Sequence, residues 1–329
     1  MSARPGSRLT ETLSRIDFRK GLLAWYDVHA RDLPWRKDRD PYRVWVSEIM
    51  LQQTRVAAVI EHYHEFLRRF PTVQKLAAAR GSSVLAAWSG LGYYRRARML
   101  HAAAKVVARK RKGKFPETSK EWLDLPGIGR YTASAISSIA FREPIAVVDG
   151  NVERVLRRIS GESLDGEPLW QSAEDLLDRD RPGDFNQAMM ELGATVCVPR
   201  APACLMCPVV TFCVSRGEMS VGRKSAAQQK REIHCALSFR KGHVFLTQRP
   251  REASLMAGMW ELPEISRPEP RTDPDFSVRH SVTVTDYLVG VWRVVAPAKS
   301  VGKWIPRDRL PKMALTGLAR KILRMADLA

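Results

Sequence analysis

Four of the five cysteines stand close together in the sequence, with the spacing Cys197-x6-Cys204-x2-Cys207-x5-Cys213. Thiolates on loops this short can hold a tetrahedral zinc ion or a cluster of iron and sulfide. An odd number of cysteines with one tight group favours a metal site in a reducing compartment over a set of disulfides. The segment therefore predicts a loop closed around a metal centre, and we expect the remaining cysteine, Cys235, to be an ordinary buried thiol.

Apolar residues recur at helical spacing from Asp17 to about Ser215, in stretches such as Val56–Phe70 and Tyr131–Ala140. Glycine and proline mark the gaps between these stretches. No clear alternation of apolar and polar residues, which would indicate strands, occurs in this part. We therefore predict a helical domain over residues 1–215.

Residues 216–231 are polar, basic and poor in apolar side chains, which is typical of a linker between domains. Beyond them, β-branched and aromatic residues predict strands over Ile233–Phe239, Val244–Thr247, Ser281–Thr285 and Tyr287–Val295. An amphipathic stretch from about Leu315 to Met325 predicts a last helix. Residues 232–329 are therefore predicted to form a small α+β domain.

The chain carries 54 lysines and arginines against 35 aspartates and glutamates, a formal net charge of +19. A fold needs no such excess, so the charge indicates a polyanionic partner, either nucleic acid or an acidic membrane surface. No apolar run of about 18 residues is present, and residues 1–10 lack the apolar core of a secretory signal. We therefore expect no segment that spans a membrane. Of the two polyanions we expect nucleic acid and no membrane partner, and we expect a place in the cytoplasm, associated with the nucleoid if the cell is bacterial.

Glu48 lies in a stretch predicted to be helical, where its neighbours at helical spacing are Val44, Trp45, Leu51 and Gln52. Mostly apolar neighbours should remove the carboxyl group partly from water and favour its protonated form. A carboxyl group that is protonated near neutral pH can serve as a general acid. The alternative is a glutamate paired with an arginine, which is the more common situation for a lone glutamate.

Asp149 follows the apolar run Ile145–Val148 and precedes the predicted helix Val152–Ile159. This position is typical of a helix N-cap, which explains an aspartate without any catalytic role. Cleavage of an N-glycosidic bond also uses a second carboxylate, because one carboxyl group protonates the leaving group while the other stabilises the sugar cation. The local sequence leaves both interpretations open.

The segment Leu125-Pro126-Gly127-Ile128-Gly129-Arg130 lies between two predicted helices. Two glycines around one apolar residue allow a tight turn whose amide groups point outward. Those amides, together with the start of the next helix, are suited to a DNA phosphate. Binding through Gly127, Ile128, Gly129 and Arg130 would not depend on base sequence, although many turns between helices contain glycine without binding DNA.

Several dispersed stretches resemble the MutY family of adenine DNA glycosylases, within the endonuclease III and helix-hairpin-helix superfamily. The matches are Leu33–Arg36, Trp45–Thr54, Gly90–Arg98, Gly113–Glu117, Leu125–Arg130, Asp149–Val155 and Phe185–Gly193. The cysteine spacing resembles the loop that holds a 4Fe–4S cluster in that superfamily. The resemblance implies a mainly α fold with two helical subdomains, a helix-hairpin-helix element and an iron–sulfur loop, followed by a small α+β domain similar to MutT-type (Nudix-like) hydrolases that recognises the lesion.

The resemblance also implies roles for the two carboxylates. In that family the residue that matches Glu48 protonates adenine and later activates water, and the residue that matches Asp149 stabilises the sugar cation. Tyr131 and Asn151 match residues that support these two. Tyr131 stands where endonuclease III-like enzymes carry a Schiff-base lysine, so the resemblance implies base removal without strand cleavage by that route.

Further positions match residues that contact DNA in the family. Trp35, Arg36 and Glu191 match the pocket for the flipped adenine, while Gln53 and Tyr93 match residues that insert near the orphaned guanine. Core packing is the alternative explanation for Trp35 and Tyr93. The implied partner is duplex DNA with adenine opposite 8-oxoguanine or guanine, bound by a monomer.

One loop departs from the family pattern. Where MutY proteins typically carry Phe-Ser-His to recognise 8-oxoguanine, this chain has Val282-Thr283-Val284. Thr283 keeps a hydroxyl group, but the aromatic and imidazole groups are missing. The loop either recognises the lesion with weaker discrimination or has changed its preference towards adenine opposite plain guanine.

The residues leave two other functions open. A pyrimidine or mismatched-thymine glycosylase could be built on the same helical scaffold. A non-catalytic binder of damaged DNA could have kept the cysteine loop and the hairpin, although the presence of both Glu48 and Asp149 argues against it.

Overall fold

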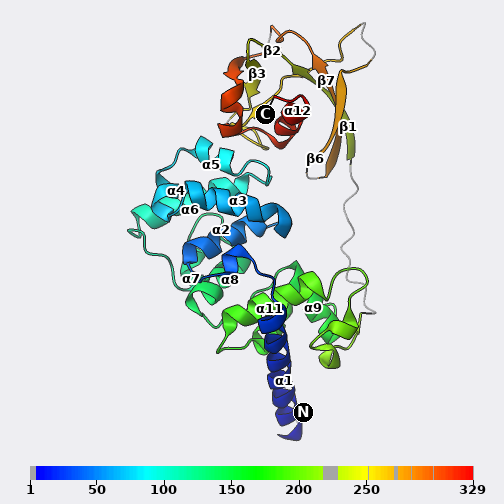
Figure 1. The fold of residues 1–329 in the computed structure, drawn as a ribbon. Coiled ribbons are helices and arrows are strands. Elements are labelled where there is room, and N and C mark those ends of the chain that lie inside the picture. Colours follow the sequence, from blue (N-terminus) through cyan, green and yellow to red (C-terminus); the bar gives the residue numbers. More distant parts are fainter. Residues whose placement is uncertain are drawn as a thin grey trace. The chain divides into compact units, whose positions relative to one another are not determined.

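Helices form the first part of the chain and strands the last part (Figure 1). The computed structural model describes residues 5–217, 229–250, 252–269, 273–282, 284–298 and 300–328. Contacts divide the chain into two units, one of Met1–Ile60 with Val106–Arg223 and the other of Glu61–Lys105 with Lys224–Ala329. The first unit contains both candidate catalytic carboxylates, the hairpin and the four clustered cysteines.

The prediction of a helical N-terminal part is confirmed, although the first helix begins at Pro5, well before the predicted start at Asp17. None of the described helices has the length and apolar character needed to cross a membrane. The helices and 3-10 turns are α1 (Pro5–His29), η1 (Pro34–Arg36), α2 (Pro41–Leu51), α3 (Val56–Arg69), α4 (Val73–Ala78), α5 (Gly81–Ala87), α6 (Arg95–Arg109), α7 (Ser119–Trp122), α8 (Arg130–Phe141), α9 (Gly150–Ser160), α10 (Gly166–Leu176), α11 (Pro182–Thr195), η2 (Cys204–Met206) and η3 (Val210–Phe212).

Capping residues decide where the helices of the site begin. The Asp40 side chain accepts hydrogen bonds from the amides of Tyr42 and Arg43, at 2.8 and 3.0 Å, and so caps α2. Asp149 caps α9 in the same way, and Gly161 ends α9 in the left-handed region. Such caps satisfy amide groups that a helix leaves unpaired at its start. They set the first residue of α2 and of α9, and with it the positions of Glu48 and Asp149.

Helices α1, α9, α10 and α11 pack around an apolar core of the first unit, which includes Leu22 and Leu156. Helix α2 packs on α8. On α2, Trp45 is fully buried, and its ring centre lies 6.4 Å from that of Phe115 and 5.5 Å from that of Trp122. These rings fix the rotation of α2 about its axis, which brings Glu48 to the inner side of the helix.

Strands of the second unit form two four-stranded sheets among the described residues. One sheet has the strand order β5-β1-β7-β6. In the other sheet β3 pairs with each of β2, β4 and β8. Strands β1 and β7 are parallel, and the other pairs are antiparallel. Their bounds are β1 (Gln229–Leu237), β2 (Phe239–Arg240), β3 (His243–Gln248), β4 (Trp260–Glu261), β5 (Glu264–Ile265), β6 (Phe276–Val282), β7 (Thr285–Arg293) and β8 (Gly302–Pro306), followed by η4 (Arg307–Lys312) and α12 (Gly317–Met325).

The predicted strand Ser281–Thr285 is wrong. Strand β6 ends at Val282, and β7 begins at Thr285, which is the antiparallel partner of Val282. Strands on both sides of a tight turn show the same alternation of apolar and polar side chains. The sequence pattern therefore could not show where β6 ends and β7 begins. Thr283 lies outside the described residues.

Two other boundaries also differ from the prediction. Strand β1 already begins at Gln229, within the predicted linker, and residues 218–228 of that linker lie outside the described part. The last helix begins at Gly317 and not at Leu315, because the hydroxyl group of Thr316 accepts a hydrogen bond from the amide of Ala319, at 3.2 Å. Cys235 is buried as expected.

Helix α11 approaches the start of α9 so closely that a side chain at position 193 would collide. A Cβ atom on Gly193 would lie 2.6 Å from Cβ of Asn151 and 3.0 Å from its carbonyl oxygen. We expect Gly193→Ala to lower the free energy of unfolding by about 1–3 kcal/mol, because overpacking outweighs the better helix propensity of alanine. Urea titration followed by circular dichroism measures the change.

Gly81→Ala is the matched control, because a Cβ atom at that helix position would meet only Nδ1 of His101, at 4.0 Å. The gain in helix propensity then acts alone, so this variant should unfold at the same or a higher urea concentration. A Gly193→Ala protein as stable as the parent would show that α9 and α11 can separate without loss.

Candidate active site and cysteine loop

Glu48 lies on α2 with 6% of its surface exposed. Its Oε2 accepts a hydrogen bond from the hydroxyl group of Tyr131 on α8, at 2.7 Å. Burial raises the pKa of Glu48 to about 7, the hydrogen bond from Tyr131 acts to lower it, and the charge of Asp149 acts to raise it. The apolar neighbours in the sequence indicated this burial, and the hydrogen-bond partner is a tyrosine where the alternative interpretation expected an arginine.

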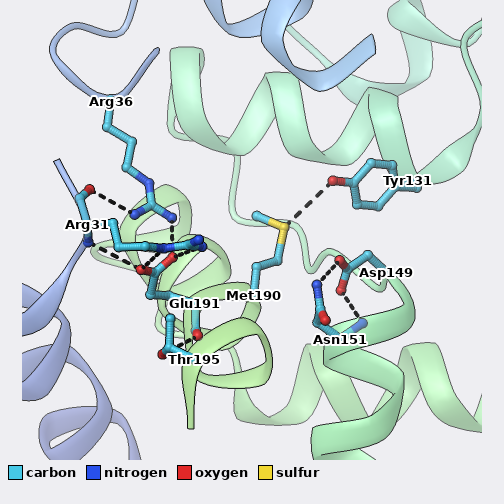
Figure 2. Close-up of polar contacts among 8 residues, drawn as sticks. All are labelled: Arg31, Arg36, Tyr131, Asp149, Asn151, Met190, Glu191 and Thr195. Carbon is cyan, nitrogen blue, oxygen red and sulfur yellow. Dashed lines mark hydrogen bonds and ion pairs between the residues drawn. The ribbon is translucent and has the colours of Figure 1, made fainter. Parts of the chain in front are cut away.

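Asp149 is the N-cap of α9. Asn151 donates its amide to Oδ1 of Asp149 and its Nδ2 to Oδ2, each at 2.9 Å (Figure 2). The amide of Val152 also donates to Oδ1, at 2.8 Å. Burial raises the pKa of Asp149, although these hydrogen bonds act to lower it. Three hydrogen-bond donors fix the orientation of the Asp149 carboxylate. Its role as the cap of α9 is therefore compatible with a role in catalysis.

Glu191 on α11 is buried, and two arginines surround it (Figure 2). Arg31 donates Nε to Oε1 at 2.6 Å and Nη2 to Oε2 at 2.8 Å, while Arg36 donates Nη2 to Oε2 at 2.8 Å. Burial alone would raise the pKa of Glu191, but the two guanidinium groups outweigh it and lower the pKa. Arg36 also lies over the ring of Tyr26, 5.5 Å from its centre. The group therefore holds an ionised carboxylate inside the protein.

Glu48, Asp149 and Glu191 line one cavity within the first unit. Trp35 is buried and also lines this cavity, so it belongs to both the core and the pocket. The other predicted site residues on its wall are Arg36, Tyr131 and Asn151. An acid with a pKa of about 7 beside a second, half-buried carboxylate can protonate a bound ring and stabilise a developing cation.

Gln53 and Tyr93 belong to different units, and each has an unusual backbone. Gln53, just after α2, has a φ of 55°, and Tyr93, just before α6, has a φ of 48°. Left-handed backbone is uncommon for residues other than glycine and is typical of constrained loops. Tyr93 is 49% exposed, so core packing does not explain it.

The predicted hairpin lies between α7 and α8. Gly127 has a φ of 78°, in the left-handed region that favours glycine, and the amide of Ile128 donates to the carbonyl oxygen of Leu125, at 3.2 Å. Gly129 caps α8 without a side chain, so no capping group occupies the first amides of the helix. The start of α8, at Arg130, therefore has the form of an anion-binding helix terminus.

The four clustered cysteines lie at the end of the first unit and form no disulfide with one another. Burial raises the pKa of Cys207 to about 11, and the charges of the other three cysteines act in the same direction, so the four lie near one another. Among the described residues, no three or more His, Cys, Asp or Glu side chains form a group that could hold a metal ion as they stand.

Two arginines of α9 contact this loop, and one of them, Arg154, connects it with Asp149. Arg158 donates Nη1 to Sγ of Cys197, at 3.3 Å. Arg154 donates Nε to the carbonyl oxygen of Cys197 at 2.8 Å and Nη2 to Oδ1 of Asn151 at 2.9 Å. Because Asn151 in turn donates to Asp149, one chain of hydrogen bonds runs from the cysteine loop to the candidate catalytic carboxylate.

Sequence reasoning missed Arg31, Met190 and Arg154. The sulfur atom of Met190 lies 3.6 Å from the hydroxyl group of Tyr131 and lines the cavity (Figure 2). Arg31 stands just before the matched segment Leu33–Arg36, and this position could have identified it as a candidate site residue. Met190 and Arg154 lie inside the matched segments Phe185–Gly193 and Asp149–Val155, but their contacts join separate helices and loops, so no role could be assigned to either from the sequence.

Comparison with known proteins places the helical part in a family. Residues 46–176 match the family described as HhH-GPD superfamily base excision DNA repair protein. The chain is 48% identical over 245 residues to the adenine DNA glycosylase of Rattus norvegicus, and the match covers 70% of this chain and 48% of that protein. The chain thus spans about half the length of this relative, and the resemblance to adenine DNA glycosylases is confirmed at the level of sequence.

Solved structures extend the likeness to the fold. A thermostable thymine-DNA glycosylase is 32% identical with a TM-score of 0.59, and the match covers 64% of this chain and 99% of that one. The chain belongs to the HhH-GPD superfamily of base excision DNA repair proteins. A trapped endonuclease III–DNA covalent intermediate, 22% identical with a TM-score of 0.54 over 62% of this chain and 97% of that one, shares the superfamily fold.

The raised pKa of Glu48 predicts that Glu48→Gln changes how stability depends on pH. In the unfolded chain Glu48 titrates near its ordinary value of 4.5, whereas in the folded protein it titrates at about 7. The folded state holds the proton more tightly, so the contribution of Glu48 to stability is complete below pH 4.5 and is lost as the pH rises through 7. Relative to the parent, Glu48→Gln should gain about 3 kcal/mol of unfolding free energy across this range.

Urea titrations of both proteins at about pH 5 and about pH 8 measure most of this change. Glu162→Gln, which removes an exposed carboxyl group, is the control and should leave the pH dependence as it is in the parent. Parallel pH profiles for Glu48→Gln and the parent would contradict the burial of an ionisable Glu48.

Proposed function

We propose that the chain is a monofunctional adenine DNA glycosylase of base excision repair, which hydrolyses the N-glycosidic bond of adenine mispaired with 8-oxoguanine or guanine. One observation carries the proposal, namely that a buried Glu48 with a pKa of about 7 shares a cavity with a second carboxylate, Asp149. The relative named adenine DNA glycosylase supports adenine as the base. The likeness to a thymine-DNA glycosylase makes thymine the second candidate.

Duplex DNA is the partner that we propose, bound by a monomer in the cytoplasm, or at the nucleoid in a bacterium. The net charge of +19 supports a polyanion, and the hairpin supplies contacts to phosphate groups that any base sequence offers. Adenine turns out of the duplex into the cavity, which costs a few kcal/mol that contacts with the pocket must offset. Trp35 offers an apolar wall to the base, and the group of Arg31, Arg36 and Glu191 offers charged donors and acceptors to its edges.

Glu48 acts first, as the general acid. With a pKa of about 7 it is protonated in a large fraction of the molecules near neutral pH. It gives that proton to the adenine ring, and the bond to the sugar breaks with its electron pair leaving on the base. Asp149 stabilises the cationic sugar, and the ionised Glu48 then takes a proton from the water that attacks the sugar carbon. Tyr131 orients Glu48 through the 2.7 Å hydrogen bond and has no amine with which to form a Schiff base.

Single-turnover excision tests the proposal directly. Protein in excess is mixed with duplexes that carry adenine opposite 8-oxoguanine, guanine or thymine, and with a duplex that carries thymine opposite guanine. We expect release of adenine, and we expect Glu48→Gln to lower its rate by about 10²- to 10⁴-fold while duplex binding persists. Glu162→Gln is again the control, with the rate of the parent.

Each other outcome replaces the proposal with a defined alternative. Release of thymine without adenine would make the protein a thymine-mismatch glycosylase. Duplex binding without release of any base would make it a non-catalytic binder. Unchanged excision by Glu48→Gln would overturn the assignment of the acid.

The same rates measure what the C-terminal region recognises. We propose that residues 232–329 form a MutT-like domain, joined to the helical domain 1–215 by the linker 216–231, and that Val282-Thr283-Val284 contacts the base opposite adenine. Much faster excision opposite 8-oxoguanine than opposite guanine would mean that this loop still senses the lesion. Similar rates would mean general repair of adenine mispairs.

A 4Fe–4S cluster is the group that we propose for Cys197, Cys204, Cys207 and Cys213. The four thiols lie close together, and as thiolates they could ligate metal ions that offset the repulsion between them. The hydrogen bond from Arg158 to Sγ of Cys197 is of the kind that tunes such clusters. When bound, the cluster supplies a rigid cross-link between the ligands of the loop. Through Arg154, that rigidity supports Asn151 and the orientation of Asp149.

The cluster predicts a brown protein with an absorbance band at about 400 nm, together with bound iron and sulfide. Removing the iron with a chelator should lower the temperature of unfolding, because a structural metal site contributes to folding free energy. A colourless protein that contains zinc would favour the single-ion interpretation. A protein without metal that is folded and active would contradict both.

A further inference from the structure

Arg130, which begins α8 beside the hairpin, is engaged by two side chains of α10. Its Nη1 and Nη2 donate to Oε2 and Oε1 of Glu167, at 2.6 and 3.1 Å. Its guanidinium carbon lies 4.0 Å from the centre of a Trp170 ring. Because Glu167 and Trp170 are three residues apart, they share one face of α10. One turn of this helix thus supplies a carboxylate to the edge and an aromatic ring to the face of the same guanidinium group.

The two contacts differ in how they would respond to DNA. A phosphate group and a carboxylate bind the guanidinium edge in the same way, through two parallel hydrogen bonds, so Glu167 occupies the edge that a phosphate would use. Trp170 uses the face and leaves the edge available for exchange. The side chains of Arg130 and Glu167 are 48% and 72% exposed, so water screens their pair and an incoming phosphate can displace it.

We infer that Glu167 is an internal phosphate mimic that weakens DNA binding by occupying Arg130; this inference rests on the proposed function. Glu167 releases the guanidinium group when a DNA phosphate reaches the start of α8, and Trp170 keeps that group in place during the exchange. Arg130 lowers the pKa of Glu167, so the carboxylate stays charged at neutral pH.

Competition by Glu167 lowers the affinity of the hairpin for DNA of every sequence. Hairpin contacts go to phosphate groups, which carry no base information, so a competitor at Arg130 weakens binding to undamaged and damaged DNA alike. Contacts inside the base pocket are unaffected, and they form only when a base has turned out. Glu167 therefore raises the share of the total binding energy that depends on the target base.

Binding to a short duplex without a mispair tests the inference, because it requires phosphate contacts and no excision. Fluorescence anisotropy should show that Glu167→Gln binds this duplex about 2- to 5-fold more tightly than the parent. The affinity of the variant should also fall more steeply with salt, because Arg130 is then free to displace counterions. In an Arg130→Gln background the change at Glu167 should have no effect, since the edge that it releases no longer exists.

Glu162→Gln is the matched control, because it removes another exposed carboxylate shortly before α10. A gain in affinity that persists without Arg130, or that Glu162→Gln reproduces, would mean general repulsion of DNA and would overturn the inference, as would the absence of any gain. Unfolding temperatures confirm that each variant is folded. A parent protein that does not bind the duplex contradicts the proposed function itself, whereas binding and excision with no effect of Glu167→Gln contradict only this inference.

Discussion

The guanidinium group of Arg154 joins three parts of the first unit. It donates to Oδ1 of Asn151 at 2.9 Å, to the carbonyl oxygen of Gly193 at 2.6 Å and to the carbonyl oxygen of Cys197 at 2.8 Å. Arg154 is buried, and burial lowers its pKa, but the acceptors around it satisfy the N–H groups of the buried guanidinium. The hydrogen bonds of Arg154 therefore fix the start of α9, the end of α11 and the cysteine loop relative to one another. The orientation of Asp149 depends on these hydrogen bonds, because Asn151, which Arg154 holds, donates its side-chain amide to Asp149.

Two glutamates in the same cavity have opposite pKa shifts, and the difference lies in their partners. Glu48 meets a hydroxyl group, which does not offset the loss of water around the carboxylate, so its pKa rises to about 7. Glu191 is also buried, but it meets two guanidinium groups, so its pKa falls. The cavity thus keeps one carboxyl group ready to give a proton and another permanently charged as an anchor for Arg31 and Arg36. This separation of roles by environment is how proteins obtain acid and base chemistry from one residue type.

Much of the site could be predicted from local sequence. The apolar neighbours of Glu48 along its helix indicated burial, the position of Asp149 before α9 indicated a cap, and the glycines at 127 and 129 indicated the turn before α8. Each of these signals depends on residues within one or two helical turns. The reversal between Val282 and Thr285 was missed because side-chain alternation is the same before and after a turn. Arg31 stands just before one matched segment, and Met190 and Arg154 lie inside two others, but no local pattern indicates which side chains they contact in the fold.

By itself, the sequence determined the helical character of the N-terminal part, the cap of α9, the hairpin and the spacing of the four cysteines. These features depend on backbone preferences and on contacts between near neighbours in the chain. Only the tertiary structure decided which carboxyl group is neutral, which is charged and which arginines hold it. Tyr131 is 83 residues from Glu48, and Arg31 is 160 residues from Glu191, yet they are hydrogen-bond partners in the fold. The pKa of a buried group depends on every dipole and charge within a few ångströms, and folding alone determines which parts of the chain supply them.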